Sequence, residues 1–234
     1  MISGLQKMTL VDFPGKVACT VFLSGCNYRC PFCHNSELFL GKPETIMSED
    51  DLIRFLDGRQ GLLDGVCVSG GEPTLHKNLP QLLRRIKELG YAVKLDTNGT
   101  RPEMVEQLLR EKLVDYIAMD IKNSPGRYAE TVGLEKTDLA PLEQTLRLLM
   151  EGDVAYELRT TLVQQLHDSV SVREMGQWLA SLVPGKKPNK LYLQSFVDRD
   201  TVVFAGLTAP EEKDVDTYRE ILSAYVEEAI VRKG

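Results

Sequence analysis

Long apolar runs are absent from this chain of 234 residues. No stretch approaches the roughly 20 apolar residues that a membrane-spanning helix needs. The opening residues 1–7 also lack the apolar stretch of a secretory signal, so we expect a cytoplasmic protein. Internal repeats, low-complexity tracts and long linkers are missing as well. We therefore expect one domain over residues 1–234, with its core over about 15–200 and a C-terminal helix over 210–232.

Basic residues are the minority among the charged ones. Lys and Arg total 28 against 34 Asp and Glu, which gives a net charge of −6. This balance argues against non-specific binding to nucleic acid or to anionic lipid. We therefore expect neither a nucleic-acid partner nor a membrane partner. The hydrophobic share of 43% is that of an ordinary globular protein, and a chain of this length can be stable without disulfides.

Cysteine is scarce, and its five copies are an odd number. An odd, clustered set in a cytoplasmic chain indicates metal or redox chemistry rather than a disulfide framework. Cys19 and Cys67 lie alone in apolar runs and are predicted to be small buried residues of strands. The other three, Cys26, Cys30 and Cys33, are clustered in one short segment.

Short β-branched runs alternate with longer segments of helical spacing. The predicted strands are 17–23, 65–69, 92–97, 116–121, 155–163 and 190–194. Helices are predicted between them, with Ser48 and Asp51 forming a capping box at one start and Thr100 and Glu103 at another. This alternation predicts an α/β fold of parallel strands with right-handed crossovers, arranged as an open, partial barrel or as a doubly wound sheet.

Polar or unusual residues lie at the ends of four predicted strands, and one more, Arg159, lies within a fifth. In chain order they are the cysteine segment, Gly70-Gly71-Glu72, Asp96-Thr97-Asn98-Gly99, Asp120 with Lys122, and Arg159. Because the carboxyl ends of parallel strands meet at one edge, we expect these residues to form a single site.

The spacing Cys26-x3-Cys30-x2-Cys33 allows one loop to hold one side of a metal centre. Three thiolates on a 4Fe–4S cluster leave one iron open for catalysis. Structural zinc needs a fourth ligand, and the nearest candidate, His34, adjoins Cys33, so the two side chains rarely point at one tetrahedral ion. The spacing favours an iron–sulfur cluster, with zinc and a chance group of buried cysteines as alternatives.

The segment Cys26-Asn27-Tyr28-Arg29-Cys30-Pro31-Phe32-Cys33 resembles the cysteine motif of the radical S-adenosylmethionine (SAM) superfamily. Val68-Ser69-Gly70-Gly71-Glu72-Pro73-Thr74-Leu75 adds to this resemblance. Within the superfamily the chain is similar to glycyl-radical-enzyme activating proteins, above all those of anaerobic ribonucleoside-triphosphate reductases. The segments that carry this likeness are Thr9–Lys16, His34-Asn35, Met119–Lys122 and Arg127-Tyr128. The family implies a partial (β/α)6 barrel with parallel strands.

The resemblance implies one 4Fe–4S cluster on Cys26, Cys30 and Cys33, with SAM on its open iron. Gly70 and Gly71 are expected to let the backbone approach the SAM amino group, and Glu72 to add negative charge beside that group. The residues assigned to SAM contacts also include Phe32, Cys33, His34, Thr97, Asn98, Asp120, Lys122 and Arg159. Asp96 and Asp120, with Thr97, are alternative ligands for a monovalent cation, as in some activating enzymes.

The chemistry that the resemblance implies needs no catalytic side chain beyond the cluster and SAM. A flavodoxin or ferredoxin-type donor reduces the cluster, and SAM is cleaved to methionine and a 5′-deoxyadenosyl radical. The radical then removes hydrogen from a glycine of the partner, which we expect to be an anaerobic ribonucleoside-triphosphate reductase. Three enzyme or carrier alternatives stay open: an activase of the pyruvate formate-lyase type, a small-molecule enzyme resembling 7-carboxy-7-deazaguanine synthase, and an iron–sulfur electron carrier.

One departure from the family pattern lies after the last core strand. Pyruvate formate-lyase activating enzymes carry a histidine there, where this chain has Ser195-Phe196-Val197. We therefore expect an adenine contact at this position to be apolar or absent.

Overall fold

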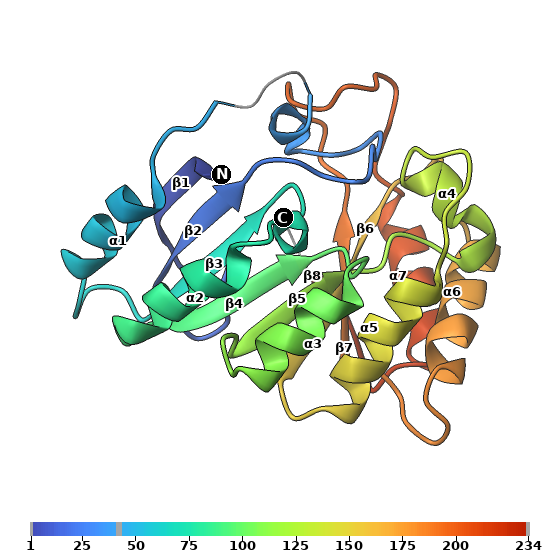
Figure 1. Ribbon diagram of the computed structural model, residues 1–234. Helices are drawn as coiled ribbons and strands as arrows, with labels where there is room; N and C mark the ends of the chain where they lie inside the picture. Colours follow the sequence, from blue (N-terminus) through green and yellow to red (C-terminus); the bar gives the residue numbers. More distant parts are fainter. Residues whose placement is uncertain (1, 41–43, 233–234) are drawn as a thin grey trace. The chain divides into compact units, whose positions relative to one another are not determined.

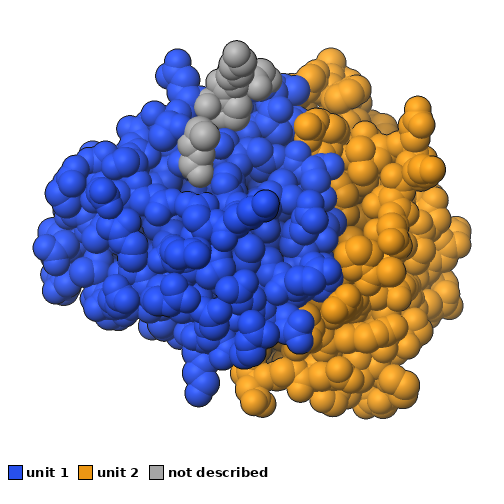
Figure 2. Space-filling model, in the orientation of Figure 1, with its two compact units in different colours: residues 1–27, 37–118 blue, residues 28–36, 119–234 orange. Residues whose placement is uncertain are grey.

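A computed structural model describes residues 2–40 and 44–232 of the chain. They form two compact units, coloured blue and orange in Figure 2. The first unit contains residues 1–27 and 37–118, and the second contains residues 28–36 and 119–234.

The first unit is a sheet with helices packed on it. Its strands are β1 (Ile2–Thr9), β2 (Ala18–Leu23), β3 (Gly65–Gly70) and β4 (Ala92–Thr97). Strand β1 is antiparallel to β2, and β2, β3 and β4 are parallel neighbours in that order. Its helices are α1 (Glu49–Asp57), α2 (Leu79–Glu88), α3 (Pro102–Arg110) and the 3-10 helix η2 (Pro73–Leu75). Helix α2 packs against α1 and β4 (Figure 1).

Local sequence explains how the helices of the first unit begin. Ser48 and Asp51 form the predicted capping box of α1, each side chain accepting from the other residue's backbone N–H. Helix α3 instead begins after Arg101, which makes no capping hydrogen bond through its side chain. The predicted cap by Thr100 and Glu103 is therefore wrong, because the Thr100 hydroxyl donates to Asn98 Oδ1 at 2.7 Å.

The second unit repeats the strand–helix alternation. Its strands are β6 (Ala155–Leu162), β7 (Lys190–Ser195) and β8 (Glu228–Arg232). All three are parallel, with β7 between the other two. Its helices are η3 (Pro125–Arg127), α4 (Tyr128–Thr131), α5 (Ala140–Glu151), α6 (Ser169–Ser181) and α7 (Glu212–Leu222). Helix α7 packs against α6, β7 and β8 (Figure 1).

Two short elements belong wholly to neither unit. The strand β5 (Tyr116–Asp120) crosses from the first unit into the second after Ala118, and the 3-10 helix η1 (Ser36–Leu38) crosses back after Ser36. The six predicted strands correspond to β2 through β7, and the predicted α/β class with parallel strands is confirmed. None of the helices among the described residues is long and apolar enough to cross a membrane.

The C-terminal helix predicted over 210–232 is wrong in its extent. Helix α7 ends at Leu222, and residues 228–232 form β8 beside β7, with Leu191 opposite Ala229 and Leu193 opposite Val231. The segment predicted as one helix is therefore helical only from Glu212 to Leu222. Ile230 and Val231 are β-branched, which favours an extended strand over a helix.

Candidate functional site

The three clustered cysteines lie on the loop that follows β2. All three are half-buried, whereas Cys19 in β2 and Cys67 in β3 are fully buried, as predicted. Cys26 belongs to the first unit, and Cys30 and Cys33 to the second. Within the second unit the Cys33 N–H donates to the Cys30 carbonyl at 3.2 Å, which closes a turn between the two thiols.

In the first unit, the glycine pair at the end of β3 packs against the backbone that leads into the cysteine loop. The Gly71 N–H donates to the Leu23 carbonyl at 2.8 Å, and the Glu72 N–H donates to the Gly25 carbonyl at 2.7 Å. A Cβ on Gly71 would lie 2.0 Å from the Gly25 oxygen, and Gly70 has a φ of +124°. Both positions therefore require glycine, because a side chain there would collide with the backbone at and just after the end of β2. The approach of Gly70 and Gly71 to SAM stays a prediction.

Glu72 joins the ends of β3 and β4. Its buried carboxylate accepts from Thr74 N at 3.0 Å, Thr74 Oγ1 at 2.5 Å, Thr97 Oγ1 at 2.8 Å and Asn98 N at 2.6 Å. Burial raises the pKa of Glu72, and these four donors oppose that shift. These hydrogen bonds show that Glu72 and Thr97 hold the ends of β3 and β4 together. Their contacts with SAM stay predictions.

Asn98 connects the end of β4 to the residue after Cys26. Its Nδ2 donates to Asn27 Oδ1 at 2.9 Å, and Asn27 Nδ2 donates to Thr100 Oγ1 at 2.9 Å. Thr100 closes the ring by donating its hydroxyl to Asn98 Oδ1. Sequence reasoning missed the roles of Asn27 and Thr100. The available signal was their position in the sequence, since Asn27 directly follows Cys26 and Thr100 directly follows Gly99.

In the second unit, three predicted SAM-contact residues form one ion-pair group. Asp120 Oδ2 accepts from Lys122 Nζ at 2.8 Å, and Asp120 Oδ1 accepts from Arg159 Nε at 3.1 Å. Burial alone would raise the pKa of Asp120, but the two cations lower it to about 2. The group keeps one excess positive charge, which could hold a small carboxylate.

Lys122 is also the charged neighbour of two cysteines. Burial lowers the pKa of Lys122, but Asp120 and the Cys30 and Cys33 side chains raise it above its ordinary value. Burial raises the pKa of the Cys33 thiol, which Lys122 partly offsets. Its ammonium lies 6.0 Å from the centre of the Phe32 ring. At Cys33 the Lys122 ammonium therefore opposes the effect of burial, and the thiolate is the form that binds metal.

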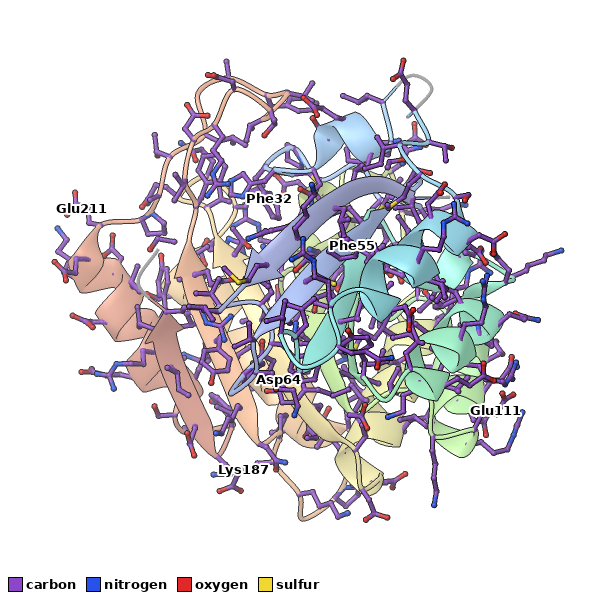
Figure 3. The ribbon with its side chains drawn as sticks, turned by 90° about the vertical axis from the view of Figure 1, so that its left-hand side faces the viewer. Phe32, Phe55, Asp64, Glu111, Lys187 and Glu211 are labelled. Atoms are coloured by element: carbon purple, nitrogen blue, oxygen red, sulfur yellow. The ribbon has the colours of Figure 1, made fainter. Side chains whose placement is uncertain are left out.

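Phe32 and His34 fix the second half of the cysteine loop by packing. Phe32, labelled in Figure 3, is 4% exposed. It packs with Val163, Leu166 and Phe196. The His34 ring stacks on Phe196 with centroids 5.8 Å apart, and its Nε2 is 2.6 Å from the Val197 carbonyl. Phe196 is thus an apolar contact of His34 in this structure. Whether Phe32 and His34 also contact SAM stays a prediction.

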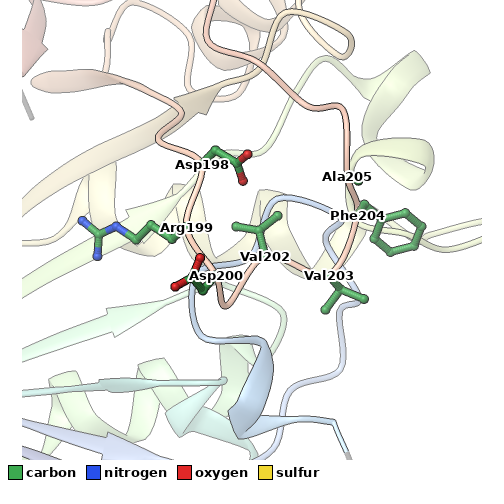
Figure 4. A pocket seen from close by; sticks show the side chains of 7 residues that line it. All are labelled: Asp198, Arg199, Asp200, Val202, Val203, Phe204 and Ala205. Atoms are coloured by element: carbon green, nitrogen blue, oxygen red, sulfur yellow. The ribbon is translucent and has the colours of Figure 1, made fainter.

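The loop after β7 surrounds a hollow of about 320 Å³. It is lined by residues between 198 and 205, among them Arg199 and the half-exposed Phe204 (Figure 4). Sequence reasoning did not single out this loop, and no predicted site residue lines the hollow. One of its lining residues, Val202, packs against the cluster that Phe32 forms with Val163, Leu166 and Phe196.

The predicted cation ligands already have charged partners. Asp96 pairs with Lys94 and accepts from the Ser69 hydroxyl at 3.1 Å, and Asp120 pairs with Lys122 and Arg159. Across residues 2–40 and 44–232, no three His, Cys, Asp or Glu side chains are placed to hold a single metal ion. The thiolates of a 4Fe–4S cluster bind different iron atoms and need no such convergence.

The low pKa of Asp120 predicts a contribution to folding stability that is lost in acid. An ordinary Asp has a pKa of 3.8 and Asp120 a pKa of about 2, so its ionisation favours the folded state above about pH 4 and that contribution is lost as the pH falls toward 2. Urea unfolding should show wild type losing about 1 kcal/mol more than Asp120→Asn between about pH 6 and pH 3. Parallel profiles for the two proteins would refute the ion-pair group.

Comparisons with known proteins agree with the cysteine motif. A model of the radical SAM superfamily matches residues 20–164. A Methanocaldococcus jannaschii protein, named provisionally as a glycyl-radical enzyme activating enzyme, is 30% identical over 99% of this chain and 95% of its own. The pyruvate formate-lyase-activating enzyme of Listeria monocytogenes is 35% identical over 94% of this chain and 95% of its own.

Solved structures show the same fold. A domain of a pyruvate-formate lyase-activating enzyme from Bacteroides vulgatus has a TM-score of 0.58 and 23% identity, over 72% of this chain and 98% of its own. The predicted α/β fold of radical SAM type is therefore confirmed.

Proposed function

The chain belongs to the radical SAM superfamily and to its glycyl-radical enzyme activating enzymes, and from this premise we propose that it generates the glycyl radical of an anaerobic ribonucleoside-triphosphate reductase. The observation that carries the activating function is the similarity to two such relatives over at least 94% of this chain. The choice of the reductase rests on the resemblance of Thr9–Lys16 and Met119–Lys122 to activators of that class.

Cys26, Cys30 and Cys33 are the residues that would hold one 4Fe–4S cluster. Their chemistry fits, because three half-buried thiols lie on one loop and the Lys122 ammonium interacts with two of them. When bound, the cluster and SAM supply one-electron reduction and a 5′-deoxyadenosyl radical that takes a hydrogen atom from the partner's glycine. No side chain of the chain needs to accept or donate a proton in this reaction.

The chain's own residues position these groups. In the first unit, the Gly71–Gly25 contact and the Asn27–Asn98 hydrogen bond fix the backbone on both sides of Cys26. In the second unit, the excess positive charge of Lys122 and Arg159 over Asp120 is suited to the SAM carboxylate, and Asp120 to a ribose hydroxyl. We assign the electron supply to a flavodoxin or ferredoxin-type donor.

Activation of two partners in parallel tests the choice of substrate. The reconstituted protein, SAM and a strong reductant are incubated anaerobically with an anaerobic ribonucleotide reductase or with a pyruvate formate-lyase. We expect ribonucleotide reduction to appear in the first mixture and no pyruvate–formate exchange in the second. Activation of the lyase alone would overturn the reductase proposal and retain the activating function.

A further inference from the structure

Four side chains lie together on one face of β3 and β4 in the first unit. Cys67 of β3 is opposite Lys94 of β4. Because alternate residues of a strand share a face, Ser69 lies on the same face as Cys67, and Asp96 on the same face as Lys94. The structure confirms this grouping, since Ser69 Oγ donates to Asp96 Oδ2 at 3.1 Å and Lys94 Nζ lies 3.8 Å from Cys67 Sγ.

Lys94 is a buried cation whose partner is Asp96. Its side chain is 1% exposed, the Asp96 side chain is 15% exposed, and Lys94 Nζ donates to Asp96 Oδ1. A lysine this deeply buried is costly unless its ammonium is paired. The sequence contains no sign of this arrangement, because a lysine at one position of a short strand usually faces solvent.

Asp96 is also one of the residues predicted to ligate a monovalent cation. The pairing with Lys94 does not fit that prediction, because Asp96 Oδ1 already accepts from an ammonium of the same single charge. The next residue, Thr97, donates to Glu72 Oε1 at 2.8 Å, which links Asp96 to the strand ends that carry Gly70 and Gly71. We therefore expect the neutralisation of the Asp96 carboxylate by Lys94 to affect the position of those strand ends.

We propose that Lys94 is a positioning residue that takes the place of a dissolved monovalent cation at Asp96. Its ammonium balances the partly buried Asp96 carboxylate and keeps the ends of β3 and β4 in place for SAM. This inference rests on the proposed function for the identity of the ligand. It requires that SAM binding by this protein be independent of potassium.

The test compares potassium chloride with tetramethylammonium chloride at equal ionic strength, since tetramethylammonium is too large for a buried cation position. SAM affinity and thermal unfolding are measured on the cluster-reconstituted protein for wild type and Lys94→Met. A matched control is Lys87→Met, which removes a half-exposed pair with Asp115 in the same unit. Methionine is close in length to lysine and leaves the Asp96 carboxylate without the ammonium.

We expect wild type and Lys87→Met to behave identically in the two salts. Lys94→Met should bind SAM about tenfold more weakly in tetramethylammonium, because removing one partner of a buried ion pair leaves the other uncompensated. Potassium should restore most of that affinity and raise the midpoint of thermal unfolding, Tm, by about 4 °C. A merely structural role for Lys94 would give the same loss in both salts.

Three results would overturn the proposal: potassium dependence of wild type, an equal loss in both salts, or unchanged SAM affinity of Lys94→Met. If Lys94→Met does not fold, the test rests on wild type in the two salts. A wild-type SAM affinity that depends on potassium would then overturn the proposal, and an affinity that is independent of potassium would support it. SAM affinity and Tm are measured without a partner protein. A failure of radical transfer to any reductase would therefore refute the proposed function and leave this test unaffected.

Discussion

Cys30→Ser is expected to abolish assembly of the iron–sulfur cluster, and with it all reductive cleavage of SAM. Iron binds thiolate far better than a serine hydroxyl, and three thiolates on one loop leave no spare ligand to replace a lost one. Cys30 is half-buried and interacts with the ammonium of Lys122. Iron and sulfide content and visible absorption after anaerobic reconstitution measure the result.

Cys19→Ser is the matched control for this loss. Cys19 is 0% exposed within β2, and burial raises the pKa of its thiol to about 12. The thiol therefore stays protonated, and no metal can reach it without opening the sheet. We expect iron content to equal that of wild type. An equal loss of iron from Cys19→Ser and Cys30→Ser would show that the ligand assignment is wrong.

Gly71→Ala is expected to destabilise the protein by about 3 kcal/mol, because the new methyl overpacks a site enclosed by backbone. The Cβ would lie 2.0 Å from the Gly25 oxygen and 3.3 Å from the Cys26 nitrogen. Backbone atoms cannot turn aside as a flexible side chain can, so the start of the cysteine loop must shift. We therefore expect lower cluster content as well, measured as iron per chain beside urea unfolding.

Gly126→Ala is a control with the same chemical change. A Cβ on Gly126 meets no atom within 4 Å, and the residue does not need a positive φ. Alanine there should leave stability within about 1 kcal/mol of wild type. If Gly71→Ala folds as stably as Gly126→Ala and keeps its cluster but binds SAM weakly, the glycine serves SAM contact rather than the packing that the structure shows.

Strand positions were predictable wherever a strand is buried on both faces. The run Gly65–Gly70 is buried over its first four residues, so its β-branched sequence alone predicted it. Strand β1 was missed because most of its residues are partly or fully exposed, which leaves no apolar run to detect. The extent of α7 was wrong because Tyr225, Val226 and Ala229 continue a helical spacing by chance after the helix has ended.

Charged site residues at a strand end or within a strand were predictable, but hydrogen-bond and ion-pair partners such as Asn27 and Lys94 were not. Asp120, Lys122 and Arg159 were each singled out, and the structure brings them into one ion-pair group. The Asn27–Asn98 hydrogen bond joins residues 71 positions apart, a pairing that spacing along the chain cannot reveal. The burial of Lys94 depends on what covers its strand face, which is likewise set by tertiary packing.

The central claim, that this chain transfers a radical to the glycine of a partner enzyme, is tested most directly by electron paramagnetic resonance. The reconstituted protein, SAM, a strong reductant and the cognate anaerobic ribonucleotide reductase are mixed without oxygen, and the spectrum of the reductase is recorded. We expect a glycyl radical doublet that collapses when the reductase is labelled with deuterated glycine and is absent when its radical glycine is replaced by alanine. Cleavage of SAM by an intact cluster without any doublet would contradict the account and favour a small-molecule substrate.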